Sequence, residues 1–275
     1  VAAGLHRQFD HCRIRGAVGF GGVLFGYLED GGVLASLLKP SSASIVFGGT
    51  FGFALIAFPK EYLSQLPKAL KFALFAPRED YDGLVESMFH FSDIARKKGL
   101  LALESEAESQ RDSFIKKGLM SVADGVEPEY LKQLMEGEIE SLCRGYEQAA
   151  TVLEGMGGAA PTMGVLGTVM GMVSILRDMG SDMGELGAKI ATAFIATMYG
   201  VGSANLLWIP LGNHIKLLNE KEREYYELVL DGFLLIQSGE YPARVKEVLL
   251  SRIGELGGKK GGGGSAVSGA GEVPA

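Results

Sequence analysis

Residues that build disulfide frameworks or metal centres are scarce in this sequence. Its 275 residues include two cysteines, Cys12 and Cys143, which lie far apart and without the spacing of a zinc site. The four histidines are scattered and form no cluster. The formal net charge is −7, which argues against a broad basic surface for nucleic acid. The sequence thus disfavours a disulfide scaffold, a zinc domain and a general nucleic-acid binder.

Motifs of the common enzyme classes are also missing. The chain has no G-x-S-x-G nucleophile motif, no P-loop and no Rossmann fingerprint. Residues 19–26 are rich in glycine, but they lie inside an apolar run without a βαβ context. We therefore expect neither enzymatic activity nor a bound cofactor.

Charged residues are absent from four windows of the chain. Three of them are Pro40 to Pro59, Gly155 to Leu176 and Ile190 to Asn213, with 20, 22 and 24 residues. A helix needs about 20 apolar residues to cross the hydrocarbon core of a bilayer. The remaining window, Gly16 to Leu28, has 13 residues and crosses only if the acidic residues after it lie in the interface. The windows predict an all-α integral membrane protein with four transmembrane helices.

The alternative is a soluble bundle of four buried helices. A soluble helix normally keeps one polar face, and the last two windows have none. Closely spaced glycines also favour the membrane, because in water each weakens a helix by about 1 kcal/mol relative to alanine. In lipid, small residues instead let helices approach closely. The glycines are Gly19, Gly21, Gly22, Gly48, Gly49, Gly52, Gly164, Gly167 and Gly171.

Basic residues predict the orientation of the chain. Twelve Lys and Arg occur in residues 60–148 and eight after Asn213, whereas the loops within each pair of spans hold few. By the positive-inside rule, both termini are cytoplasmic. We expect six segments: an N-terminal extension (1–13), transmembrane helices one and two (14–59), a cytoplasmic helical domain (60–148), transmembrane helices three and four (149–213), a cytoplasmic C-terminal helix (214–256) and a disordered Gly-rich tail (257–275).

Acidic residues are absent from the central turns of the predicted third and fourth helices. Carboxylates inside a membrane are costly and mark ion pathways. Glu154 lies near the cytoplasmic end of the third helix, where an interfacial group is favoured over an ion carrier. If this protein moves ions, the titrating carboxylate must come from a partner.

The two helices instead contain hydroxyls and prolines. Each hydroxyl either coordinates a partly dehydrated cation or bonds a carbonyl of its own helix and serves packing. Pro161 and Pro210 either kink a helix that moves or mark a helix boundary. The hydroxyl residues are Thr162, Thr168, Ser174, Thr192, Thr197 and Ser203.

A second group of candidates lies in the predicted cytoplasmic domain. The basic residues Arg96, Lys97 and Lys98 precede the acidic residues Glu104, Glu106 and Glu108. Such a pattern is typical of a solvated face with pairs one helical turn apart, and the alternative is a charged docking surface.

Four stretches together resemble the MotA/PomA family of flagellar motor stator proteins, and the resemblance extends from about residue 14 to about residue 253. They read IVFGGTFGFALIAFP in the second helix, ARKKGLLALE in the cytoplasmic segment, APTMGVLGTVMGMV in the third helix and IATMYGVGSANLLWIPLGNHIK in the fourth. Each stretch is weak by itself, but their order and spacing are specific.

The resemblance implies an assembly and a function. Family members form a ring of five copies around a dimer of a MotB/PomB-type protein, whose single helix brings the ion-binding Asp. Ion passage turns the ring in the bacterial inner membrane, and its cytoplasmic face pushes a FliG-type rotor protein. One charge that crosses 100 mV releases about 2.3 kcal/mol, which suffices to bias near-equivalent positions of a ring.

The resemblance also implies roles for individual residues. Arg96 and Glu104 fall on the rotor-facing charges, and Pro161 and Pro210 on the two prolines linked to conformational coupling. The expected ion path includes Thr197 and Thr168. The position of Thr168 is typically Thr in sodium-driven and Ala in many proton-driven relatives, so Na+ is favoured over H+ as the transported ion.

Three other classes of protein compete with this interpretation. An ExbB/TolQ-like energy transducer is the runner-up, but such proteins typically have three spans. A self-contained secondary transporter needs intramembrane charges and usually inverted repeats, and neither is found. A structural scaffold would not need these prolines and threonines.

Overall fold

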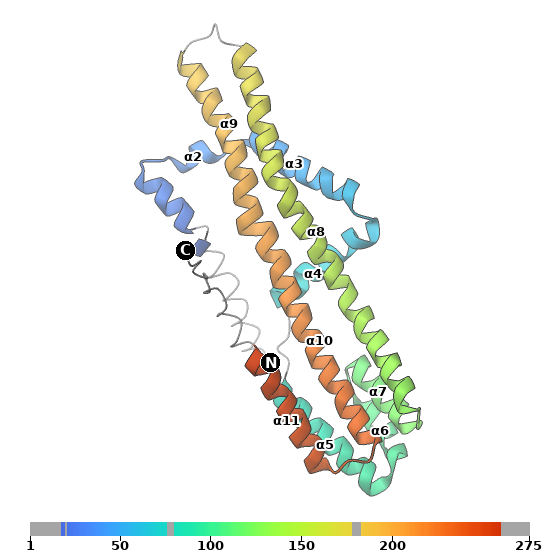
Figure 1. Cartoon of the computed structure of the whole chain (residues 1–275). Helices are drawn as coiled ribbons and strands as arrows, with labels where there is room; N and C mark the ends of the chain where they lie inside the picture. Colours follow the sequence, from blue (N-terminus) through green and yellow to red (C-terminus); the bar gives the residue numbers. More distant parts are fainter. Residues whose placement is uncertain (1–17, 20, 76–79, 178–182, 260–275) are drawn as a thin grey trace, which may run out of the picture. The chain divides into compact units, whose positions relative to one another are not determined.

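The computed structural model describes residues 18–19, 21–75, 80–177 and 183–259 (Figure 1). The chain divides into two compact units. The first unit combines residues 1–78 with 141–222, and the second combines 79–140 with 223–275. Every regular element of the described residues is helical, which confirms the all-α prediction.

The first unit contains the apolar helices. Residues 18–19 and 21–29 are helical. They are followed by α2 (Leu34–Leu37), α3 (Pro40–Ala57), α4 (Lys60–Phe75), the later part of α8 (Pro128–Arg177), α9 (Met183–Ser203), the π-helical turn η2 (Ala204–Trp208) and the first part of α10 (Ile209–Gln237).

Two prolines bound α3. Pro40 is its first residue, where the fixed φ of proline suits a helix start and the missing N–H costs nothing. Pro59 follows its end, and it forces Phe58 into an extended conformation with φ −119° and ψ 139°. The 20-residue window that the prolines bound therefore contains one helix of 18 residues.

The exposed surface of α3 is apolar, which is the reverse of a soluble helix. The buried residues form one narrow stripe at i+4 steps, of which Ser42 and Thr50 are polar. Phe51, Leu55 and Ile56 lie on the outside and are 51%, 70% and 89% exposed. Such a helix is stable where lipid surrounds it.

Three described helices are long and apolar enough to cross a membrane: Pro40–Ala57, the helix Pro128–Arg177 and the continuous helical stretch Leu186–Gln237. The predicted first span, residues 16–28, lies partly outside the described residues, so the count of four spans remains a prediction. The N-terminal extension and the end of the Gly-rich tail also lie outside them.

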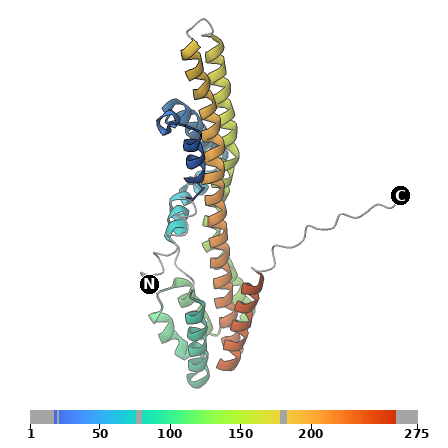
Figure 2. The same ribbon diagram turned by 90° about the vertical axis from the view of Figure 1, so that its left-hand side faces the viewer.

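Glycines set the distance between α8 and α9, which run side by side in Figures 1 and 2. Gly164 and Gly200 face each other: a Cβ on Gly200 would lie 2.6 Å from the Ala160 carbonyl oxygen and 2.9 Å from the Gly164 Cα. A Cβ on Gly171 would lie 2.8 Å from the Ala193 Cβ. The backbones touch where lipid supplies no hydrophobic driving force, as expected for membrane helices.

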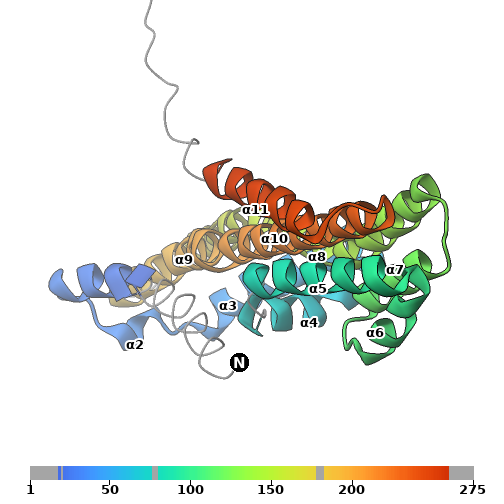
Figure 3. The same cartoon turned by 90° about the horizontal axis from the view of Figure 1, so that it is seen from below.

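The second unit has the amphipathic helices of a water-exposed bundle. Its elements are α5 (Tyr81–Lys98), the 3-10 turn η1 (Leu100–Ala102), α6 (Leu103–Ser109), α7 (Ser113–Ala123), the first part of α8, the later part of α10 and α11 (Pro242–Lys259). Figure 3 shows α6 and α7 side by side. The side chains of Met88, Phe114 and Phe233 are buried in its core.

Caps explain where the helices of the second unit begin and end. The Asp80 carboxylate accepts a hydrogen bond from the Gly83 N–H before α5, and Asp112 accepts one from Phe114 before α7. Gly99 ends α5 with φ +86°, a conformation that favours glycine. These local signals turn the predicted helical pattern into separate short helices.

Candidate functional site

The Thr168 and Thr197 side chains meet between α8 and α9. Their Oγ1 atoms lie 2.5 Å apart, and both residues are half-buried. Thr168 Oγ1 also lies 3.0 Å from the Ala193 carbonyl oxygen and 3.1 Å from that of Gly164. The structure thus brings together two residues 29 positions apart, and their two hydroxyl oxygens and two carbonyl oxygens make a cluster of four oxygen atoms.

Three of the other predicted hydroxyls bond within their own helices. Thr162 donates to Ala159, Thr192 to Ala188 and Ser203 to Gly200. These contacts are the local backbone bonds that a hydroxyl makes in an apolar helix. Thr168 and Thr197 differ because their hydroxyls join two helices.

Pro161 lies inside the continuous helix α8. Proline has no N–H, so the Gly157 carbonyl one turn earlier loses its usual helical partner. A Cβ on Gly157 would lie 2.4 Å from the Ile209 side chain. Ile209 therefore packs directly on the turn that Pro161 leaves open.

Pro210 is the second residue of α10, and α10 directly follows the π-helical turn. The Ile209 N–H bonds the Ala204 carbonyl five residues back instead of the one four back. Proline cannot bond the Leu206 carbonyl, and one wide turn absorbs this loss. Such π turns are frequent at functional sites. Ile209 precedes Pro210 and contacts Gly157, so the two irregular turns lie next to each other.

Glu154 is paired rather than free. Its carboxylate lies 2.6 Å from the Lys216 Nζ, and the two side chains are 35% and 47% exposed. The pair joins α8 to α10 outside the charge-free windows. This geometry agrees with an interfacial group.

Tyr199 makes hydrogen bonds between distant segments and is not among the residues predicted from the sequence. Its hydroxyl donates to the Leu37 carbonyl and accepts from the Lys39 N–H at 3.3 Å. Lys39 is the N-cap residue of α3, so Tyr199 ties the start of α3 to α9. A tyrosine in an apolar window is itself a signal, because its hydroxyl needs a polar partner.

Arg96 and Glu104 both lie exposed on the second unit. Arg96 is in the last turn of α5 and Glu104 in the first turn of α6. Lys97 pairs with Asp93 at 2.7 Å, which is the local pairing expected of a solvated face. The Arg96 guanidinium carbon instead lies 3.5 Å from the centroid of the Tyr241 ring.

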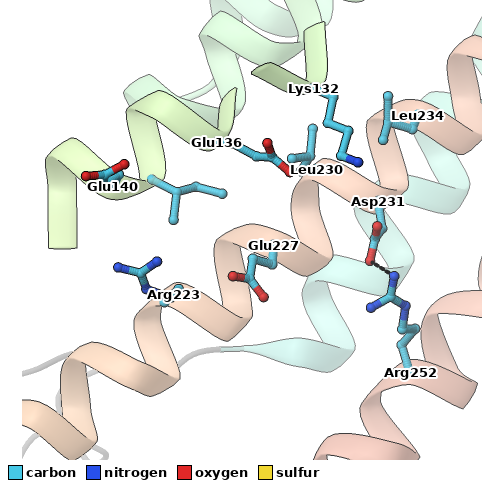
Figure 4. A pocket seen from close by; sticks show the side chains of 10 residues that line it. Lys132, Glu136, Glu140, Arg223, Glu227, Leu230, Asp231, Leu234 and Arg252 are labelled. Atoms are coloured by element: carbon cyan, nitrogen blue, oxygen red, sulfur yellow. Dashed lines mark ion pairs between the residues drawn. The ribbon is translucent and has the colours of Figure 1, made fainter. Parts of the chain in front are cut away.

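A groove of about 420 Å³ in the second unit is lined by charges of both signs (Figure 4). Arg252 and Asp231 form an ion pair at 2.9 Å across it. Burial raises the pKa of the Asp231 carboxyl, against the opposing effects of Arg252 and Lys132. The mixed charge gives the groove no preference for one kind of ion.

Tyr146 lies in α8 before the charge-free window and stacks on Phe72 with ring centroids 4.2 Å apart. Burial, and then the charges of Glu222 and Cys143, raise its pKa to about 12. A phenol with this pKa stays protonated at neutral pH.

Comparisons with known proteins agree with this architecture. The model of the MotA/TolQ/ExbB proton channel family matches residues 106–228. Motility protein A of Bacillus subtilis is 31% identical over 82% of this chain and 83% of its own length. Chemotaxis protein PomA of Vibrio alginolyticus is 28% identical over 82% of this chain and 88% of its own length.

Solved structures show the same fold. The structure of C. jejuni MotAB superposes with a TM-score of 0.84 at 25% identity and covers 88% of this chain and 95% of that chain. The flagellar MotAB stator complex from Bacillus subtilis gives a TM-score of 0.76 at 30% identity and covers 88% of this chain and 98% of that chain. The sequence and the fold together show that this chain belongs to the MotA family of stator proteins, which are ion channels and not enzymes.

Proposed function

We propose that this chain is the ion-conducting stator subunit of a bacterial flagellar motor and converts cation flow into torque. The observation that carries the proposal is the Thr168–Thr197 hydroxyl pair, at 2.5 Å, between two apolar helices. Membership of the stator family supports it. A flagellar motor is favoured over an ExbB/TolQ-like transducer, because motility proteins are similar to most of the chain.

The transported ion in this proposal is Na+ rather than H+. The Thr168 hydroxyl oxygen lies within hydrogen-bond distance of three other oxygen atoms. They are the hydroxyl oxygen of Thr197 and the carbonyl oxygens of Ala193 and Gly164. Oxygen ligands of this kind can replace part of the hydration shell of a small hard cation. A proton needs no such shell, and an alanine at position 168 would serve it equally well.

A MotB/PomB-type single-span subunit supplies the missing carboxylate. The two charge-free windows that contain Thr168 and Thr197 have no Asp or Glu. A cation inside the membrane requires a negative charge nearby to compensate for its lost hydration. The similar structures of C. jejuni and Bacillus subtilis are titled as MotAB complexes. We infer a ring of five copies of this chain around a dimer of that partner.

The two irregular turns at Pro161 and Pro210 couple ion passage to movement. Gly157 and Ile209 bring these turns into contact, so a shift of one helix is transmitted to the other. Carbonyls without an intrahelical partner make such turns easier to bend than a regular helix.

Arg96 and Glu104 provide the charges that dock on a FliG-type rotor protein. Both are exposed, and they carry opposite charges on neighbouring elements of the second unit. This placement requires that unit in the cytoplasm, and so both termini on the inner side of the cytoplasmic membrane, as the basic residues indicate.

The test compares Thr168→Ala with Thr162→Ala on the same helix, in a motile strain that depends on this chain. Loss of the Thr168 hydroxyl removes a cation ligand, so the sodium concentration for half-maximal swimming speed should change by roughly tenfold. Thr162 is exposed and bonds its own helix, so its variant should keep the normal response. An unchanged sodium response of Thr168→Ala removes the sodium assignment.

A further inference from the structure

The loop between α10 and α11 is held in one conformation by backbone contacts. Gly239 has φ +76°, its N–H bonds the Ile236 carbonyl, and the Glu240 N–H bonds that of Leu235. These two bonds are a Schellman motif, which ends α10. The buried Ser92 hydroxyl of α5 donates to the Glu240 carbonyl at 3.2 Å. The loop is thus fixed to both α10 and α5.

Tyr241 follows directly and occupies the N-cap position of α11. Its carbonyl accepts from the N–H groups of Arg244 and Val245 at 2.8 and 3.0 Å. A Ser, Thr, Asp or Asn side chain at an N-cap would stabilise the helix further, and the tyrosine side chain cannot do so. Its ring is 63% exposed, so neither capping nor core packing explains a tyrosine here.

The Tyr241 ring instead stacks against the Arg96 guanidinium, whose carbon atom lies 3.5 Å from the ring centroid. This is well within the range of about 6 Å for a cation–π contact. A stacked guanidinium uses its face and leaves its five in-plane N–H donors free for a carboxylate. Arg96 is therefore held in place without losing its capacity for bidentate docking.

We propose that Tyr241 is a positioning residue that preorganises Arg96 for an acidic site on the rotor protein. The inference rests on the docking role of Arg96 in the proposed function. An unrestrained arginine would lose rotamer freedom on every docking event, whereas the stacked arginine has already lost it. The fixed loop supplies the rigidity, and the ring supplies the contact.

The experiment measures stall torque in cells whose only stator contains Arg96→Ala, Tyr241→Leu, Tyr241→Phe or Arg96→Ala with Tyr241→Leu. Arg96→Ala should lower torque. Tyr241→Leu should lower it about two- to fivefold, the range for an exposed cation–π contact. Tyr241→Phe keeps the ring face and should retain normal torque. The double variant should equal Arg96→Ala, because Tyr241 acts only through that arginine.

Tyr130→Leu is the matched control, since Tyr130 is a similarly exposed tyrosine of the second unit at 59%, and its torque should be normal. If Arg96→Ala lowers torque but Tyr241→Leu does not, the positioning role is wrong and the docking role stands. The positioning role is also wrong if the double variant is weaker than Arg96→Ala, or if Tyr241→Leu lowers the melting temperature of the purified stator. Normal torque for Arg96→Ala rejects both roles.

Discussion

The single Thr168 hydroxyl proton has more acceptors than it can satisfy. Its oxygen lies within hydrogen-bond distance of the Thr197 hydroxyl, which can donate or accept, and of the Ala193 and Gly164 carbonyl oxygens, which only accept, but a hydroxyl donates only one hydrogen bond. The site therefore has an excess of lone pairs, which is the condition that favours a cation. A threonine that only packed the helices would need one acceptor.

At the same scale, Asp231 gives a prediction about pH. Its pKa is raised, so the folded chain binds this proton more tightly than the unfolded chain does. The contribution of Asp231 to stability is then fully present below the usual pKa of 3.8 and is lost as the pH rises through the raised value. Asp231→Asn should reduce this dependence of the melting temperature and should change the stability at pH 7 by less than ~1 kcal/mol.

Arg252→Gln is the matching variant for that measurement. It removes the cation and leaves the half-buried Asp231 carboxylate without its partner at 2.9 Å. Removing one partner of such a pair costs more than the pair contributes. Arg252→Gln should therefore lower the melting temperature at pH 7 more than Asp231→Asn; the opposite order would contradict the raised pKa.

At the scale of elements, the contact between α8 and α9 depends on the absence of side chains. Gly200→Ala would place a methyl group 2.6 Å from the Ala160 carbonyl oxygen, and backbone cannot yield as a flexible side chain does. We expect a loss of about 1–3 kcal/mol in stability, as for other overpacked contacts, measured as thermal unfolding of the detergent-purified protein.

The control for this change is Gly202→Ala on the same helix. A Cβ at position 202 would meet no atom within 4 Å, so alanine there should be neutral or stabilise the helix by up to about 1 kcal/mol. Equal effects of the two variants would mean that the helices can separate without cost.

At the scale of the whole molecule, the apolar exterior predicts how the protein behaves in solution. Between 22% and 33% of the apolar window in each of the three spans is buried within the chain itself, so most of this surface needs lipid or a partner. The protein should stay in the membrane fraction after an alkaline wash and dissolve only with detergent. A folded, dispersed chain in plain buffer would disprove the membrane assignment.

Several features of this fold could be predicted from the sequence because they depend on local chemistry. Residues 40–57 become a helix that prolines bound, since proline acts on its immediate neighbours. The missing charge of residues 155–176 and 190–213 predicts membrane helices, because burial of charge in lipid is costly at any position. The residues of the proposed ion site, Thr168 and Thr197, come from the family resemblance and not from spacing alone.

Other features depend on which segments meet. The π turn before Pro210 could not be predicted from the proline alone, because Pro161 also lacks an N–H and lies within a continuous α-helix. The partner of Arg96 is Tyr241, 145 positions later, and the Lys39 N–H that precedes α3 bonds the hydroxyl of Tyr199, 160 positions later. Such pairs depend on the packing of the helices, which periodicity does not specify.

The sequence by itself determined that this protein is helical, that it enters a membrane and that residues 155–176 and 190–213 contain no carboxylate, because these properties follow from where charge is absent. Only the tertiary structure decided that Thr168 meets Thr197, that the two proline turns touch and that Arg96 stacks on Tyr241. Each of these contacts joins distant segments at a few ångströms, and such distances are set by the glycine contacts and the loop geometry of the folded chain.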